Sequence, residues 1–218
     1  MPLIHPCQTK KLSCILLSRR NIIVRMLFKR LTAFFLDILE VVVFAIAIFL
    51  FIYLLVLQPH KIKGQSMVPN FDDGEYLLTD KVTYRFREPK RGDVIVFEAP
   101  GANGEEFIKR IIGLPGEKIS LKDGKVYLNT QQLPEYYLPS SFQTNGSSFL
   151  SENEEIVVPA GNYFVMGDNR GASYDSRSWG YITKDKITGR AWLVYWPVAK
   201  MGVVDNVVYD NNQEVTAL

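Results

Sequence analysis

The sequence of 218 residues contains only two histidines and two cysteines. Both cysteines, Cys7 and Cys14, precede a long apolar stretch, so the part of the chain after that stretch has no disulfide and no cysteine nucleophile. His5 also lies before it, which leaves His60 as the one histidine of the later part. A Ser-His-Asp triad or a histidine-based zinc site there would depend on His60 alone. We expect neither a metal nor an organic cofactor.

Acidic residues are missing from the start of the chain. None precedes Asp37, whereas seven basic residues do: Lys10, Lys11, Arg19, Arg20, Arg25, Lys29 and Arg30. Once these residues, Asp37 and Glu40 are set aside, 18 of the 25 basic and 21 of the 23 acidic residues remain. The later part is therefore mildly acidic and carries no basic stripe. We expect no nucleic-acid partner.

The apolar stretch Val41–Leu57 contains no charged residue. Extended back to residue 31, it is long enough for a membrane-spanning helix. The basic residues before it place residues 1–30 in the cytoplasm as a tail and everything after residue 57 outside. We therefore predict a single-pass anchor over 31–57, with a lipid bilayer as partner.

Two alternatives to an anchor remain at this stage. A buried core helix would have the same composition, and a cleaved signal peptide would occupy the same position. The stretch is longer than a signal peptide's apolar region, and no small-x-small site follows it. A separate expectation concerns Met26, which would be a natural first residue. Residues 1–25 would then be a disordered extension or lie outside the native chain.

The residues from 58 onward predict a mainly β fold. Short apolar or alternating runs such as "GDVIVFEAP" and "GRAWLVYWPV" are separated by Pro, Gly, Asp and Asn, and "KDGK" is a hairpin signal. We predict an all-β domain of coiled antiparallel sheets over 58–200, with a small subdomain inserted at about 120–158. Residues 201–218 would form a C-terminal tail.

Without a usable Cys or His triad, a serine nucleophile needs another base. Ser66 lies in "KIKGQSMVPNF", between Gly64 and Pro69, in what reads as a tight turn. A lysine can activate a serine if burial keeps its amine neutral. Lys109 lies in "EEFIKRIIGLPGEK", where strand alternation places it on the same face as Phe107 and Ile111. The alternative is a strand lysine whose amine reaches solvent.

A third segment, "MGDNRGASYDSRSWG" at residues 166–180, is dense in Asp, Asn, Arg, Ser and Gly. It could form a hydrogen-bonded polar network that orients a base. A long surface turn would have the same composition.

Together these segments resemble bacterial type I signal peptidases. "GQSMVPNF" is similar to that family's serine box, "RGDVIVFEAP" to the strand that follows, "FIKRIIGLPGEKI" to its lysine box and "GDNRGASYDSRSWG" to its Gly-Asp-Asn-Arg box. They occur in the family's order behind an N-terminal apolar segment, and the likeness covers roughly residues 31–198. It implies a membrane-bound serine endopeptidase that removes signal peptides from exported preproteins at the bacterial cytoplasmic membrane, after small residues in an Ala-x-Ala pattern.

The resemblance also implies residue roles. Ser66 matches the nucleophile and Lys109 the general base, while Ser173 matches a serine that orients the lysine. Asp175 and Arg177 match a structural ion pair, and Asp168, Asn169 and Arg170 open the same box. The residues that match the substrate pocket are Ile62, Met67, Phe107 and Ile108. Gly64 departs from relatives in which a serine at this position completes the oxyanion hole.

Other functions stay open on the sequence. A self-cleaving Ser-Lys regulator would need a scissile linker and usually a DNA-binding domain, whereas this chain has an apolar helix. A specialised protease that matures pilin or conjugation proteins would differ only in its substrates. A non-enzymatic, membrane-anchored β-domain that binds partners would leave a signal peptide intact.

Overall fold

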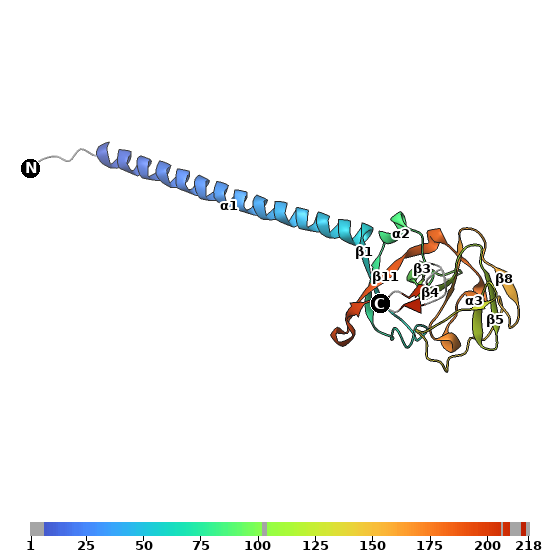
Figure 1. Cartoon of the computed structure of the whole chain (residues 1–218). Helices are drawn as coiled ribbons and strands as arrows, with labels where there is room; N and C mark the ends of the chain where they lie inside the picture. Colours follow the sequence, from blue (N-terminus) through green and yellow to red (C-terminus); the bar gives the residue numbers. More distant parts are fainter. Residues whose placement is uncertain (1–6, 102–103, 206, 210–214, 217–218) are drawn as a thin grey trace, which may run out of the picture. The chain divides into compact units, whose positions relative to one another are not determined.

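The structure is a computed structural model that describes residues 7–101, 104–205, 207–209 and 215–216. The chain divides into two compact units, residues 1–52 and 53–218. Helix α1 (Cys7–Leu55) accounts for the described part of the first unit and continues into the second. The second unit holds the β strands (Figure 1). This confirms the predicted mainly β fold of antiparallel sheets behind an N-terminal apolar helix.

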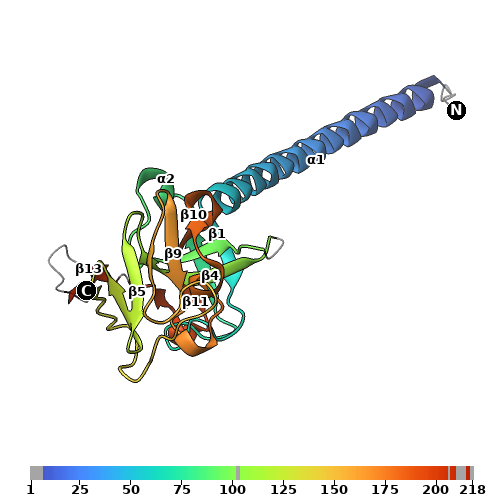
Figure 2. The ribbon, with the colours of Figure 1, turned by 90° about the vertical axis from the view of Figure 1, so that its right-hand side faces the viewer.

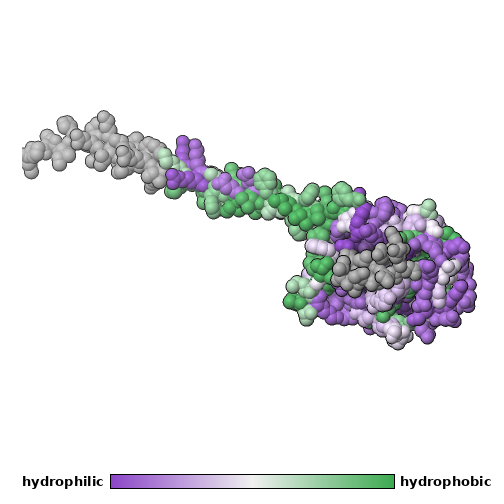
Figure 3. Space-filling view, in the orientation of Figure 1, coloured by the Kyte–Doolittle hydropathy of each residue, from purple (hydrophilic) through white to green (hydrophobic). Residues whose placement is uncertain are grey.

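Helix α1 is long and apolar enough to cross a membrane. Its stretch Arg25–Leu55 has 31 residues and an 18-residue window of mean hydropathy 2.9, none of which is buried in the structure. At 1.5 Å per residue, 31 residues extend about 46 Å, more than the roughly 30 Å of a bilayer core. Figure 3 shows a mostly hydrophobic surface over the coloured part of this helix and a mostly hydrophilic surface over the coloured part of the visible face of the β unit.

The helix boundaries differ from those expected. Residues 7–25 continue α1 without a break, so in the described residues they do not form the expected disordered extension. Residues 1–6 lie outside the described part of the chain. The helix ends at Leu55, and Leu57 already begins strand β1, because Pro59 and the pairing with β2 favour extended backbone there.

The larger sheet carries the candidate site. Its strands run in the order β1-β2-β11-β3-β4-β9-β10, with β12 paired to β11, and every printed pairing is antiparallel. Figure 2 shows β4, β9 and β11 within this sheet. The bounds are β1 Leu57–Lys61, β2 Tyr76–Asp80, β3 Val94–Glu98, β4 Glu106–Gly113, β9 Asn162–Met166, β10 Ile182–Thr183, β11 Ile187–Trp196 and β12 Gly202–Val203. Since β12 pairs with β11, the sheet extends past residue 200, where a tail was expected.

A second sheet has the order β7-β6-β5-β8. Its strands are β5 Lys118–Lys122, β6 Lys125–Leu128, β7 Gln131–Gln132 and β8 Glu155–Val157. Asp123 and Gly124 join β5 to β6, with φ of 49° and 71°. Positive φ at both residues of a two-residue loop is the geometry that the predicted Asp-Gly hairpin needs. This sheet occupies the region where an inserted subdomain was expected.

The remaining described elements are short. They are α2 Thr83–Phe86, α3 Ser176–Trp179, the 3-10 turns η1 Arg170–Ala172, η2 Lys184–Lys186 and η3 Val198–Lys200, and a small pair of strands, β13 Val208–Tyr209 and β14 Val215–Thr216.

Three buried clusters hold the β unit together. One joins the second sheet to β4 and β9 through residues such as Leu121, Ile112 and Phe164. Another lies between β3, β9 and β10. The third lies beneath the candidate site and consists of Ile62, Met67, Phe71, Leu77, Val94, Val96, Ile108, Ala191 and Val194. Burial of these side chains fixes the strands on which the site residues stand.

Candidate active site

The turn that carries Ser66 follows β1 and is held from both sides. Gly64 has φ of +84°, in the left-handed region that glycine adopts without strain, and its N–H donates to Asp73 Oδ1 at 2.8 Å. After the serine, the carbonyl of Met67 accepts hydrogen bonds from the N–H groups of Asn70 and Phe71 at 3.1 and 3.0 Å. The Met67 side chain is 1% exposed. Ser66 therefore stands on a turn whose entry and exit are both fixed.

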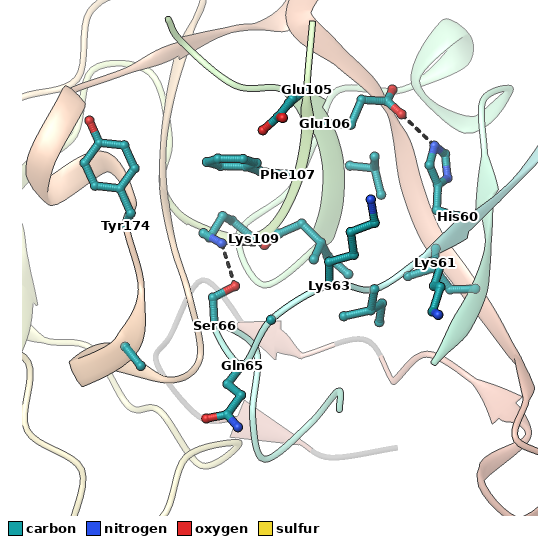
Figure 4. Close-up of a pocket in the computed structure, with 16 residues that line it drawn as sticks. His60, Lys61, Lys63, Gln65, Ser66, Glu105, Glu106, Phe107, Lys109 and Tyr174 are labelled. Carbon is teal, nitrogen blue, oxygen red and sulfur yellow. Dashed lines mark hydrogen bonds and ion pairs between the residues drawn. The ribbon is translucent and has the colours of Figure 1, made fainter. Parts of the chain in front are cut away.

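Lys109 lies on β4 with its amine directed at this turn (Figure 4). Its Nζ lies 2.7 Å from Ser66 Oγ and donates a second hydrogen bond of 3.0 Å to the carbonyl oxygen of Ile108. The residue is only 4% exposed, so its amine does not reach solvent as a surface lysine's would. The two residues named from the sequence are thus in direct contact.

Burial changes the acid-base behaviour of Lys109. Removing the ammonium from water disfavours the charged form and lowers the pKa of Lys109 from 10.5 to about 8. The negative charges of Asp175 and Asp168 act in the opposite direction and raise this pKa by a smaller amount. A substantial fraction of the amine is therefore neutral near pH 8, with a lone pair that can accept the proton of the Ser66 hydroxyl.

The next residue on β4 ties the strand to the polar loop 166–180. Arg110 donates to both carboxylate oxygens of Asp168, from Nε at 2.9 Å and from Nη2 at 2.6 Å. Asn70 Nδ2, from the serine turn, donates to the same Asp168 carboxylate at 2.8 Å. Arg110 and Asp168 are 3% and 1% exposed. Neighbouring residues of a strand point to opposite faces, so Arg110 lies on the face of β4 opposite Lys109, and that face is buried as well.

Asn169 holds the serine turn directly. Its backbone N–H donates to the carbonyl oxygen of Ser66 at 3.0 Å, and its side-chain amide donates to the carbonyl oxygen of Gln65 at 3.1 Å. The loop thereby fixes the peptide groups on both sides of Ser66.

Asp175 and Arg177 form a buried ion pair inside the loop. Arg177 Nε and Nη2 each lie 2.8 Å from an Asp175 oxygen, and the backbone N–H of Gly167 donates to Asp175 at 3.0 Å. Burial raises the pKa of Asp175, but the hydrogen bonds and charge of Arg177 outweigh it and leave this pKa below its ordinary value. The carboxylate stays charged and organises the loop around it.

The other arginine of the loop joins it to the segment between β7 and β8. Arg170, 3% exposed, forms an ion pair with Glu135 and donates to Thr144 Oγ1 at 2.5 Å and to Tyr137 OH at 3.2 Å. The sequence predicted a small inserted subdomain at about 120–158, but it did not predict these contacts. Isolated polar residues in an irregular segment show no sequence pattern that indicates which distant residue they contact.

Ser173 differs from its expected role. Its Oγ is buried, and in the described part of the chain no hydrogen bond joins it to Lys109. The Ile108 carbonyl holds the lysine amine instead. The Ser173 hydroxyl interacts with the Asp175 carboxylate and helps to lower the pKa of that group. Ser173 packs against Gly167, where an added Cβ would lie 2.2 Å from Ser173 Oγ and 2.5 Å from the Ser66 carbonyl oxygen. Ser173 therefore packs closely against the loop backbone beside the serine turn.

A cavity of about 590 Å³ opens beside Ser66 and Lys109 (Figure 4). Of the expected pocket residues, Ile62, Phe107 and Ile108 line it. Met67 does not, because its side chain turns into the core cluster beneath the site. Leu77 and Val96 add further apolar surface. The described residues contain no group of three or more His, Cys, Asp or Glu that could hold a metal ion.

The cavity wall also includes a pair that sequence analysis did not assign to the site, His60 and Glu106. Their side chains contact through Nε2 and Oε2 at 2.8 Å. The two residues lie 46 positions apart on different strands, so the local sequence pattern does not predict their contact.

Comparisons with known proteins show the family of the chain. The family model described as "Signal peptidase, peptidase S26" matches residues 35–196. A signal peptidase I of Leptolyngbya laminosa is 39% identical over 157 residues, which cover 67% of this chain and 72% of that protein. Signal peptidase I T of Bacillus subtilis is 35% identical over 181 residues, 79% of this chain and 91% of that protein.

Among solved structures, a crystal structure of a signal peptidase I from Enterococcus faecalis is 31% identical. The match covers 48% of this chain and 97% of the Enterococcus chain, with a TM-score of 0.39. The span matched by the family model includes the serine turn, β4 and the polar loop.

Proposed function

This chain belongs to the peptidase S26 family of signal peptidases, which are serine proteases, and we propose that Ser66 and Lys109 form its catalytic dyad. The observation that carries the proposal is the 2.7 Å contact between Ser66 Oγ and Lys109 Nζ in a setting that buries the amine. A nucleophile and a base within hydrogen-bond reach are what acyl transfer through serine requires.

The chemistry follows from that contact. Neutral Lys109 accepts the hydroxyl proton as Ser66 Oγ attacks the scissile carbonyl carbon. The resulting oxyanion is stabilised by the backbone N–H of Ser66. Protonated Lys109 then gives its proton to the leaving amine, which leaves an acyl-enzyme ester on Ser66. Lys109, neutral again, takes a proton from water as that water attacks the ester, and Ser66 is regenerated.

The substrate binds in extended form along the first half of β4. Strand β9 pairs with β4 only at Arg110, Ile111 and Gly113 in the described register, so the edge over residues 106–109 is open on that side. A peptide can add there as a strand. Alternate side chains of an extended peptide point to the same face, so the first and third residues before the cut enter the cavity. The apolar wall near Ser66, made by Ile62 and Ile108, favours small residues such as alanine at the first position.

Helix α1 anchors the enzyme in the membrane across which preproteins are exported. The mean hydropathy of 2.9 supports a span, and the basic residues before it support a cytoplasmic N-terminus. Cys7 and Cys14, the only cysteines in the sequence, give a direct test. A membrane-impermeant maleimide should label them only after whole cells are permeabilised. Labelling of intact cells would contradict this orientation.

The proposal is tested by incubating the full-length protein in detergent with a labelled preprotein. The wild type should release the signal peptide, and Ser66→Ala should lower the rate by at least about 10⁴-fold with an unchanged thermal melting curve. Cleavage by Ser66→Ala at the wild-type rate would rule out the nucleophile. An intact preprotein after incubation with folded wild-type enzyme would favour a partner-binding domain instead.

A further inference from the structure

The substrate cavity has an apolar and a polar end. The Phe107 ring lies beside Lys109, with its centroid 5.4 Å from Nζ, whereas His60 and Glu106 lie across the cavity from Ser66 (Figure 4). The side chains of His60 and Glu106 are 15% and 28% exposed. A hydrogen-bonding pair in a pocket wall restricts which ligand group can bind beside it.

The pair is held rigidly by threonines from two further strands. His60 stands on β1, and its Nδ1 lies 2.9 Å from the hydroxyl of Thr79 on β2. Glu106 opens β4, and its second oxygen, Oε1, accepts a hydrogen bond from Thr188 on β11. Both ring nitrogens and both carboxylate oxygens thus have a partner, so the orientation of each group is set before substrate arrives.

Glu106 lines the cavity and still has acceptor capacity. A carboxylate offers about four lone-pair positions, and His60 and Thr188 occupy two of them. The imidazole has none left, because each of its nitrogens is engaged. The polar end therefore suits a hydrogen-bond donor.

The charges around the cavity restrict that donor further. Lys61 and Lys63, both exposed, line the cavity together with Glu105 and Glu106, so the charges of these four residues balance and favour neither an acidic nor a basic side chain. A neutral donor can bind Glu106 without the cost of removing a second charge from water, and a hydroxyl is the smallest such donor.

We infer that the His60–Glu106 pair makes a specificity subsite for a hydroxyl-bearing substrate side chain, serine or threonine, at the third position before the cut. The inference rests on the proposed function, because the substrate strand along β4 brings that side chain to this end of the cavity. The hydroxyl donates to Glu106, while the Leu77 and Val96 surface contacts the rest of the side chain.

The test compares two peptides that are identical except for threonine or valine at the third position, since these side chains have nearly the same shape. Wild-type enzyme should cleave the threonine peptide with about tenfold higher kcat/KM, the effect of a hydrogen bond to a charged group. Glu106→Leu should lose this preference and favour valine. Glu106→Gln, which keeps an acceptor oxygen without its charge, should give an intermediate ratio.

Glu98→Leu is the matched control. Glu98 lies directly opposite Glu106 on β3, and its carboxylate pairs with Lys186 instead of lining the cavity. This variant should keep the wild-type preference for threonine. Because each ratio comes from one enzyme preparation, a partly misfolded variant does not alter it.

Two results would overturn the inference: equal rates on both peptides with wild type, or an unchanged ratio in Glu106→Leu. Either is distinct from failure of the proposed function, in which neither peptide is cut in a Ser66-dependent way.

Discussion

The backbone N–H of Asn169 donates to the carbonyl oxygen of Ser66 at 3.0 Å, which binds the polar loop to the turn that carries the nucleophile. The loop is in turn fixed to β4 by the Arg110–Asp168 pair. Ser66 and Lys109, on separate segments, are therefore held in register by one shared loop. A rigid support of this kind is needed because a displacement of about 1 Å at a reacting pair can cost 10²-fold in rate.

The close approach beside that contact predicts the effect of Gly167→Ala. The added methyl would lie 2.5 Å from the Ser66 carbonyl oxygen, so the turn or the loop must move. We expect kcat/KM on a signal-peptide substrate to fall by about 10²-fold. Gly171→Ala is the control within the same loop, since its added Cβ meets nothing within 4 Å. Equal activity of both variants would show that the packing at Gly167 does not position Ser66.

Asp175→Asn should destabilise the fold. The substitution leaves the Arg177 guanidinium, 5% exposed at its side chain, without a charged partner. Breaking a buried pair in this way costs about 3 kcal/mol of unfolding free energy, measurable by denaturant titration. Glu155→Gln, which removes the exposed Lys118–Glu155 pair, should cost less than about 1 kcal/mol. Similar losses in both variants would contradict the structural role of Asp175.

The same pair gives the fold an acid sensitivity. The pKa of Asp175 is lower in the folded state than in the unfolded chain, so its stabilisation is fully present above the unfolded value of about 3.9. It is lost as the pH falls through the folded value. Acid unfolding of Asp175→Asn should therefore show a shallower dependence on pH below about 4 than wild type does.

Replacing Lys109 by arginine or by methionine should abolish activity, although only the arginine keeps a charge in the buried site. Lys109→Arg keeps a positive charge that burial does not remove, so it has no neutral base to offer. We expect both variants to lose at least about 10⁴-fold in kcat/KM. Lys109→Met fills the buried site with an uncharged side chain, so it should fold well and show that the loss of activity is not a loss of structure. Measurable processing by Lys109→Arg would exclude a proton-accepting role.

Folding stability should rise with pH on account of Lys109. Its pKa of about 8 in the folded state lies below the 10.5 of an exposed lysine, so between these values the unfolded chain binds one more proton than the native protein. Wild type should thus gain about 3 kcal/mol of unfolding free energy relative to Lys109→Met from below pH 8 to above pH 10.5. A constant difference between the two proteins would contradict the depressed pKa.

Local pattern predicted the mainly β fold and marked Ser66 and Lys109 as candidates, while their roles as nucleophile and base came from the resemblance to the family. Alternation around Lys109 identified a residue flanked by Phe107 and Ile111, and a turn signal identified Ser66. The hairpin at 123–124 was predicted from its residue types, because aspartate and glycine tolerate the positive φ that the structure shows there. Each of these features depends on residues that are close together in the sequence.

Contacts between distant segments could not be predicted in the same way. Met67 was expected in the pocket, but its side chain is buried in the core. An irregular turn has no side-chain periodicity, so the sequence does not indicate which way this side chain points. The Arg170–Glu135 pair and the His60–Glu106 pair each join residues from different elements. Ser173 has the right position in the loop, but the direction of its hydroxyl depends on tertiary packing against Gly167.

The pH dependence of kcat/KM tests the central claim, that burial makes Lys109 a neutral base for Ser66. It is measured on one signal-peptide substrate across pH 6–11, and activity should rise with pH as Lys109 loses its proton. The account predicts that this rise has its midpoint near pH 8, the pKa of the buried amine. A midpoint near 10.5, the ordinary value for a solvated lysine, would contradict it.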